Sequence, residues 1–381
     1  MTVSTSKDVT SVDVVGWNEM TEVQISQWRE LRTSRPEFAP PFFAPDFAAA
    51  VHAARQDVWI AILRDHVDQV VGFFPFHRRS VGFGRTVGVP VGRFLNDAHY
   101  VVADSSTQID WRLMARQCNV VGFDLHAAIG ASSDVIESHR LDCVQAYQAD
   151  FDGDSEAYFQ SLRKRHRTIE KQAQKTRKLG REIGPIRLEV DCRSPEVLQQ
   201  TIDWKRAQYR RTHILDLFTP DWTRRLIQYL HRDAEREATI RSLHNEPLRG
   251  LLSILWAGDR VAAAHFGMIE QGRLHYWFPT YDPELGRYSP GTALFVELIC
   301  AATANGIDTI DMGYGEQPYK RKQTATTSLV ACGTITDSSA HRLIYQCRSS
   351  WAALLKKMPL KEPAKAAWRS IHPNAGLGKI N

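Results

Sequence analysis

The feature that most constrains the fold of this chain is an internal repeat with an offset of about 190 residues. An apolar hairpin, then a helix, then a buried strand occur in this order twice. Aligning Val70 with Val261, and Phe123 with Ile310, gives nearly the same offset in both cases. The chain has 381 residues, too many for one ordinary core. We therefore expect two copies of one α/β unit.

Residue patterns predict the elements of each copy. Apolar runs rich in β-formers predict strands, and a helix-forming stretch precedes the last strand of both copies. The expected fold class is α/β (α+β), with two tandem units whose mixed sheets are flanked by helices. The predicted strands cover residues 57–63, 69–76 and 120–127 in the first copy and residues 251–256, 261–269, 273–281 and 307–315 in the second.

A strongly basic segment lies between the copies. Residues 163–181 hold nine Lys or Arg and one acid. Helix formers dominate this segment, and Gly180 suits a C-terminal stop. We interpret it as a solvated connecting helix; the alternative is a phosphate-binding surface for a nucleotide sugar, a lipid carrier or RNA. A second basic tract, residues 342–381, has eight Lys or Arg and one acid, and is a candidate for contact with anionic lipid.

These patterns divide the chain into four predicted segments. They are an N-terminal unit over 10–150, a basic helical connector over 151–185, a C-terminal catalytic unit over 186–335 and a basic tail over 336–381.

Composition narrows the class of protein. Hydrophobic residues make up 43% and charged residues 24%, which is typical of globular proteins. The net charge of +5 permits an acidic partner without requiring nucleic acid. Six scattered cysteines favour reduced thiols over disulfides, and their spacing predicts no metal site. Because no signal peptide or membrane-spanning run is recognised, we expect a cytoplasmic protein, with peripheral association at the inner membrane as an option.

The strongest chemical signal is the helix start Ser289-Pro290-Gly291, directly after a predicted strand. Serine is a good N-cap and proline suits the first helical position. The N-terminus of a helix offers backbone N–H groups and a positive dipole end to an anion. The predicted donors are the N–H groups of Gly291, Thr292 and Ala293 together with the hydroxyl groups; the alternative is an ordinary capped helix.

The stretch "DMGYGEQPYK", Asp311 to Lys320, ends the last predicted strand. Open α/β sheets present ligands at the carboxyl ends of their strands, and the two glycines permit a close approach. Asp311, Glu316 and Lys320 are therefore predicted to bind substrate. Tyr319 is a candidate proton donor.

Other polar residues stand among apolar neighbours. His265 shares a strand face with small residues, so we expect room for a ligand beside its ring and a role as a base. Asp282 is expected either to orient this base or to begin a turn. Further candidates for substrate binding are Asp97, expected in a cleft between the units, and Lys205 and Tyr209, expected on one helix face.

Four stretches in this order carry a resemblance to a known family: "YFQSLRKRHRTIEKQAQKTRKLG", "DWKRAQYRRT", "GDRVAAAHFGMIEQGRLHYWFPTYDPELGRYSPGTALFVELI" and "IDTIDMGYGEQPYKRKQ". Over residues 146–324 the chain resembles the CelD/BcsL-like acetyltransferases of the GNAT superfamily, which are associated with cellulose and exopolysaccharide biosynthesis. The "YSPGT" segment departs from the common GNAT pyrophosphate loop, which is richer in basic and glycine residues.

The resemblance implies two GNAT-like units and an acyl-CoA co-substrate, most simply acetyl-CoA, with no metal. It implies that the pyrophosphate of the donor binds at residues 289–293. The implied reaction is N-acyl transfer to an amino sugar or related amine, with polysaccharide synthase machinery as a partner. His265 would then accept a proton and Tyr319 would protonate the leaving thiolate. Two alternatives remain: a Fem-like transferase that uses aminoacyl-tRNA, and a non-catalytic scaffold of a polysaccharide synthase.

Overall fold

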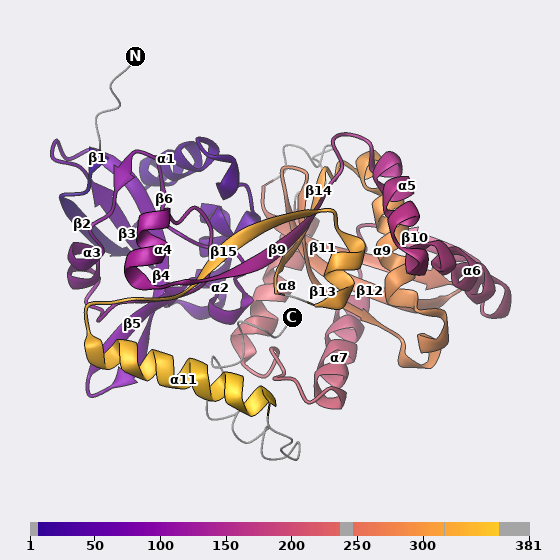
Figure 1. Ribbon diagram of the computed structural model, residues 1–381. Helices are drawn as coiled ribbons and strands as arrows, with labels where there is room; N and C mark the ends of the chain where they lie inside the picture. Colours follow the sequence, from indigo (N-terminus) through magenta and orange to yellow (C-terminus); the bar gives the residue numbers. More distant parts are fainter. Residues whose placement is uncertain (1–6, 237–246, 316, 358–381) are drawn as a thin grey trace. The chain divides into compact units, whose positions relative to one another are not determined.

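Each of the two sequence copies forms a series of neighbouring strands with mixed pairing in the computed structural model, which describes residues 7–236, 247–315 and 317–357 (Figure 1). Unit 1 takes the described residues up to Gln145 and from Leu329 onward, and unit 2 takes Ala146–Ser328. The predicted class, α/β with mixed sheets flanked by helices, is confirmed.

The sheet of unit 1 has the strand order β15-β8-β5-β4-β3-β2. Neighbouring strands from β2 to β5 are antiparallel, and β5 and β8 are parallel. Strand β15 then pairs antiparallel with β8. The elements are β1 Lys7–Asp8, β2 Ser11–Gly16, α1 Glu22–Thr33, α2 Pro45–Arg55, β3 Trp59–Arg64, β4 Val70–Gly82, β5 Arg85–Pro90, β6 Val102–Ala103, β7 Thr107–Gln108, α3 Trp111–Gln117, β8 Phe123–Ala128, α4 Ser133–His139, β15 Thr326–Ile335 and α11 Ser339–Lys357.

Unit 2 repeats this pattern with the order β9-β14-β13-β12-β11-β10. Strands β10 to β13 are antiparallel neighbours, β13 and β14 are parallel, and β14 and β9 are antiparallel. The elements are β9 Asp142–Asp150, α5 Ser155–Arg165, α6 Arg167–Glu182, β10 Ile186–Glu189, α7 Pro195–Arg211, α8 Asp221–Arg236, β11 Arg249–Ala257, β12 Arg260–Glu270, β13 Arg273–Tyr281, α9 Pro290–Ala301, β14 Thr309–Tyr314 and α10 Pro318–Gln323.

The residues aligned in the sequence repeat fall in matching strands. Val70 lies in β4 and Val261 in β12, while Phe123 lies in β8 and Ile310 in β14. The last strand of each sheet does not follow the repeat in chain order. Strand β9 follows β8 along the chain but pairs with β14, and β15 follows β14 but pairs with β8. Each sheet is thus completed by a strand that begins in the other copy's part of the sequence.

Helices cover both faces of the unit 2 sheet (Figure 1). Helix α9 packs with α5 and α6 on one face, where Leu162, Ile169 and Leu179 lie in the same apolar clusters as the buried residues of α9. Helices α7 and α8 pack against β11, β12 and β13. The ring of Phe218, between these two helices, lies 5.0 Å from that of Phe278 on β13.

Both basic segments differ from their predicted organisation. Residues 163–181 are not one helix, because the chain leaves helical geometry at His166 between α5 and α6. Both helices belong to unit 2, since their apolar residues complete its core. Helix α11 is the described part of the predicted tail and belongs to unit 1; residues 358–381 lie outside the described residues. No described helix is long and apolar enough to cross a membrane.

Candidate active site

Strands β13 and β14 of unit 2 are paired over only part of their length. They pair in parallel from Arg273 with Thr309 as far as His275 with Asp311, and no further pairing joins them among the described residues. At the same level Gly267 of β12 stands opposite two residues of β13, Tyr276 and Trp277, in a β-bulge. The six residues of β13 after His275 therefore have an edge that β14 does not use, and an extended ligand can pair with such an edge.

The bulge requires glycine at position 267. A Cβ there would lie 2.3 Å from the carbonyl oxygen of His275 and 2.7 Å from Cε1 of His265. Any larger residue would push β13 away from β12. The backbone of the bulge is therefore held at the point where β13 separates from β14.

The N-terminus of α9 has a different cap from the predicted one. Ser289 is the N-cap residue with φ 53° and ψ 55°, and its side chain caps no N–H group of the helix. The Ser289 hydroxyl instead accepts a hydrogen bond from Lys175 Nζ of α6 at 2.8 Å. The N–H groups of Thr292 and Ala293 donate to the Ser289 carbonyl at 3.0 and 3.1 Å. The prediction that both would face an anion is therefore wrong for the structure as it stands.

Gly291 stays a candidate for anion binding at this helix start. Its N–H has no hydrogen-bond partner among the described residues. A Cβ at this position would have one near neighbour, Tyr281 Cδ1 at 3.6 Å, so the space above the helix end is open. The groups that can meet an anion here are the Gly291 N–H, the Ser289 hydroxyl and the Lys175 ammonium, together with the helix dipole.

His265 does not have the predicted free space. Its side chain is 0% exposed and stacks on the ring of Tyr276, with centroids 3.8 Å apart. Neither ring nitrogen has a hydrogen-bond partner among the described residues. Burial, with His275 and Lys205 nearby, holds the pKa of His265 well below its usual range, so the ring is neutral near pH 7. Its role as a base stays a prediction, and the lowered pKa makes it a weak base.

Asp282 begins a turn and does not orient His265. Its Oδ1 accepts from the N–H of Glu284 at 2.9 Å, which is the pattern of an Asx turn. Its Oδ2 accepts from Arg260 Nε at 2.8 Å. Both carboxylate oxygens are used in this way. Of the two expectations for Asp282, the structure therefore shows the turn.

The end of β14 holds its polar groups in two ways. Asp311 accepts a hydrogen bond from the Gly313 N–H at 2.7 Å, and its Oδ1 lies 3.9 Å from His275 Nδ1. Lys320 was expected to project toward a ligand, but it is 1% exposed and its Nζ donates to the Tyr314 carbonyl at 2.7 Å. This hydrogen bond joins α10 to the end of β14. Glu316 lies outside the described residues.

Tyr319 remains accessible near this site. It is the second residue of α10, and its side chain is 39% exposed. Burial raises the pKa of Tyr276, and Tyr319 raises it further, so the two phenols lie within electrostatic range of each other. Tyr276 is the residue that stacks on His265 at the β13 bulge.

Helix α7 brings a lysine to the free edge of β13. Lys205 Nζ donates to the Pro279 carbonyl at 2.8 Å, and it lies 5.3 Å from the centroid of the Tyr209 ring. Burial lowers the pKa of Lys205 to about 8. The predicted shared face of Lys205 and Tyr209 is present in the structure. Asp97 is buried in unit 1, and its place in a cleft between the units stays a prediction.

Two groups at the site escaped the sequence interpretation. His275 reads as an ordinary strand residue, and only the pairing of β13 with β14 brings it beside Asp311. Lys175 was one of nine cations in a basic segment, and only the packing of α6 shows that it reaches Ser289. Lys175 lies three residues after Gln172 on the same helix face, and the Gln172 side chain donates to the Tyr288 carbonyl next to Ser289.

Comparisons with known proteins identify the type of domain in unit 2. Residues 163–321 match the family model described as an acetyltransferase (GNAT) domain. This match covers the β13–β14 split, the start of α9 and the loop after β14. The chain is accordingly an acyltransferase with a GNAT domain. A comparison with curated proteins found no match.

Three solved structures show the extent of similarity to this chain. The crystal structure of FemX is similar with a TM-score of 0.56 at 10% identity, covering 87% of this chain and 100% of FemX. The C-terminal domain (DUF2156) of a putative lysylphosphatidylglycerol synthetase from Agrobacterium fabrum has a TM-score of 0.48 at 10% identity, covering 85% and 94%. A tandem GNAT protein from the clavulanic acid biosynthesis pathway has a TM-score of 0.43 at 9% identity, covering 86% and 98%. At such identities the FemX similarity shows the fold alone.

Proposed function

We propose that this acyltransferase transfers an acetyl group from acetyl-CoA to the amine of an amino sugar or a related acceptor, in the assembly of a surface polysaccharide. The observation that carries the proposal is the combination, inside the described part of the matched GNAT domain, of a β13 edge that β14 does not use and a helix start with an unpaired N–H group. The polysaccharide role follows from the CelD/BcsL-like resemblance. A cytoplasmic location, including the inner face of the membrane, fits the supply of acetyl-CoA.

The pyrophosphate and the pantetheine arm of the donor are proposed to bind at two different places in unit 2. Its pyrophosphate would lie at the start of α9, against the Gly291 N–H, the Ser289 hydroxyl and the Lys175 ammonium. Its pantetheine amides would pair with the β13 edge as an added strand does. The thioester would then reach the Gly267 bulge, and backbone N–H groups near the bulge would polarise its carbonyl.

The proposed reaction is a direct transfer. The neutral acceptor amine attacks the thioester carbonyl carbon, a C–N bond forms, and the C–S bond breaks. The acceptor ammonium loses its proton to a base of the enzyme, and Tyr319 gives a proton to the departing thiolate. Asp311 and Tyr209 are proposed to hold the acceptor. Positioning supplies much of the rate, since effective molarity contributes up to about 7–11 kcal/mol.

Two side chains are candidates for the base. His265, the candidate from the sequence, is neutral but buried, with a depressed pKa. Lys205 lies at the free β13 edge, and its pKa of about 8 leaves a neutral fraction at slightly alkaline pH. The pH profile distinguishes them, because a base acts only when it is deprotonated.

If Lys205 is the base, kcat/KM should rise with pH and level off above an apparent pKa of about 8. Arginine at this position keeps a cation and donors but cannot deprotonate, so Lys205→Arg should lose this step and most of the turnover. The measurement is the pH–rate profile of the wild type, Lys205→Arg and His265→Gln. A step near pH 8 that persists in Lys205→Arg would remove Lys205 from this role, and loss of activity in His265→Gln alone would assign the base to His265.

The Fem-like alternative rests on the similarity to FemX and on the exposed cations of α5 and α6. A thermal-shift experiment with acetyl-CoA, longer acyl-CoAs and aminoacyl-tRNA separates the donor classes, because a ligand of the native state raises the melting temperature by mass action. We expect a shift with acetyl-CoA and none with aminoacyl-tRNA in moderate salt. A shift with aminoacyl-tRNA alone would favour the Fem-like transferase, and none with any donor would favour the scaffold.

A further inference from the structure

Unit 1 repeats the strand order of unit 2, so its sheet has a place equivalent to the proposed donor site. This place lies between the parallel strands β5 and β8, at the start of the helix α3 that connects them. If both copies kept the same chemistry, each molecule would hold two donors. The two copies differ at both of the features that the proposed function assigns to donor binding.

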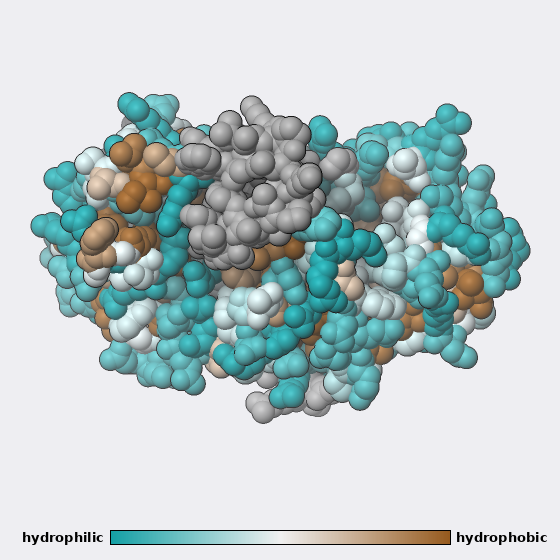
Figure 2. Space-filling view, turned by 90° about the horizontal axis from the view of Figure 1, so that it is seen from below, coloured by the Kyte–Doolittle hydropathy of each residue, from teal (hydrophilic) through white to brown (hydrophobic). Residues whose placement is uncertain are grey.

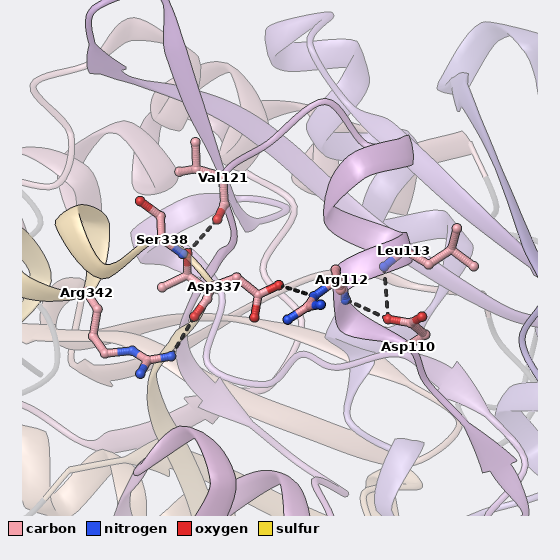
Figure 3. A network of polar contacts seen from close by, with 8 residues as sticks. Asp110, Arg112, Leu113, Val121, Asp337, Ser338 and Arg342 are labelled. Atoms are coloured by element: carbon pink, nitrogen blue, oxygen red, sulfur yellow. Dashed lines mark hydrogen bonds and ion pairs between the residues drawn. The ribbon is translucent and has the colours of Figure 1, made fainter.

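The first difference is the start of the connecting helix. Helix α3 has seven residues, against twelve in α9. Its N-cap is Asp110, and the N–H groups of Arg112 and Leu113 both donate to Asp110 Oδ1 at 2.9 Å (Figure 3). A carboxylate of the chain itself thus occupies the position of an anionic ligand, and its charge repels a phosphate. In α9 the corresponding Ser289 carries no charge and leaves the Gly291 N–H unpaired.

Neighbouring groups hold this arrangement in place. Arg112 Nε donates to Asp337 Oδ2 at 2.7 Å, so the cation nearest to the α3 start is paired with a second carboxylate (Figure 3). Asp337 lies in the turn between β15 and α11. That turn is fixed by Thr336, whose hydroxyl donates to the Val121 carbonyl at 2.5 Å and whose carbonyl accepts from Arg342 at 2.6 Å. Arg112 is thus paired with a carboxylate of the chain, whereas Lys175 in unit 2 donates to the uncharged Ser289 hydroxyl.

The second difference is the strand edge. Strands β5 and β8 pair only at Gly88 and Phe123. Beyond this pair the edge of β8 is used by the segment around His99, whose N–H donates to the Ala127 carbonyl at 3.0 Å. The His99 carbonyl accepts from the Ile129 N–H at 3.1 Å. Through this isolated bridge of His99 with Ala128, a segment of the chain itself lies along β8 on its β5 side. The counterpart in unit 2 is the gap between β13 and β14, where the pantetheine arm is placed.

We infer that each chain binds one acyl donor, in unit 2, and that unit 1 is a copy whose donor site is closed by Asp110 and by the His99 segment. The inference rests on the proposed function. Unit 1 then binds no acyl donor and is not a second catalytic centre.

The test is the number of CoA sites per full-length chain, measured by titration calorimetry. We expect one site in the wild type, no site in Gly291→Glu, and one site of unchanged affinity in Asp110→Ser, since serine keeps the cap and removes the charge. Two sites in the wild type, or one site that survives Gly291→Glu, would overturn the inference. Absence of binding by every acyl-CoA would reject the proposed function itself, and the inference would fall with it.

A second measurement uses only the wild-type protein, so it still tests the inference if a variant does not fold. Hydrogen exchange of the wild type with and without CoA reports which backbone amides a ligand protects. Protection of residues 276–281 and 289–294 supports the inference. Protection of residues 98–100 or 110–113 would contradict it.

Discussion

Replacing Tyr319 with phenylalanine is expected to lower the rate constant for acyl transfer by about 10²–10⁴-fold, the usual contribution of one general acid. The proposed role of Tyr319 is to protonate the thiolate of CoA as the C–S bond breaks. Its side chain is partly exposed and within electrostatic range of the phenol of Tyr276, which lies at the β13 bulge where the thioester is placed. Phenylalanine keeps the ring and removes only the proton, so acyl-CoA affinity should stay nearly unchanged.

Tyr229→Phe is the matched control for this change. Tyr229 lies on α8 in the same unit and is 38% exposed, against 39% for Tyr319. It is remote in sequence from the β14 exit and has no proposed role, so its variant should turn over within about twofold of the wild type. Turnover of Tyr319→Phe within tenfold of the wild type, measured with a confirmed acceptor, would show that Tyr319 only packs at this site.

Gly291→Glu is expected to weaken acyl-CoA binding by at least about 100-fold, or roughly 2.7 kcal/mol. The new carboxylate would stand at the start of α9, where the donor pyrophosphate is placed, and like charges at one site cost several kcal/mol. It would also compete for the Lys175 ammonium. The fold should survive, because the position has space and an acidic residue in the first turn of a helix is favourable. Calorimetry measures the affinity, and urea unfolding measures the stability.

Two variants separate charge from bulk and from position. Gly291→Gln has almost the same shape without the charge and should lose much less affinity. Gly286→Glu places the same carboxylate in the preceding turn, where its Cβ would also have Tyr281 as its near neighbour, at 3.8 Å. It should bind acyl-CoA nearly as well as the wild type. Equal affinity of Gly291→Glu and Gly286→Glu would remove the pyrophosphate from the start of α9.

The sequence predicted seven strands of the fold but not the partner of every strand. Apolar runs located β11 to β14, and the repeat offset related them to β3, β4 and β8, whereas β2, β5, β9, β10 and β15 were not predicted. The exchange of β9 and β15 was not predictable, because pairing between distant strands depends on the whole fold and leaves no local pattern. The break at His166 was also missed, because the segment around it contains no proline or glycine, and His166 leaves helical geometry with φ −128° and ψ 101°.

At the site, sequence patterns found residues but not their directions. The roles of Gly291 and Tyr319 stay predictions: Gly291 has an N–H at the start of α9 that is unpaired among the described residues, and Tyr319 is partly exposed. His265 has small strand neighbours, yet Tyr276 fills the space beside its ring, since the bulge at Gly267 alters the register of β13. Lys320 turns inward because the Tyr314 carbonyl is buried and needs a donor. Such directions depend on register and on buried backbone groups, which a one-dimensional pattern does not contain.

The most direct test of the central claim is acyl transfer by the purified full-length chain. The protein is mixed with acetyl-CoA and an amino sugar, and the free CoA thiol and the N-acetylated sugar are measured together. The account predicts that both appear in equal amounts and that neither appears with Gly291→Glu. Aminoacyl transfer from charged tRNA to an amine, with no CoA released from acetyl-CoA, would contradict it.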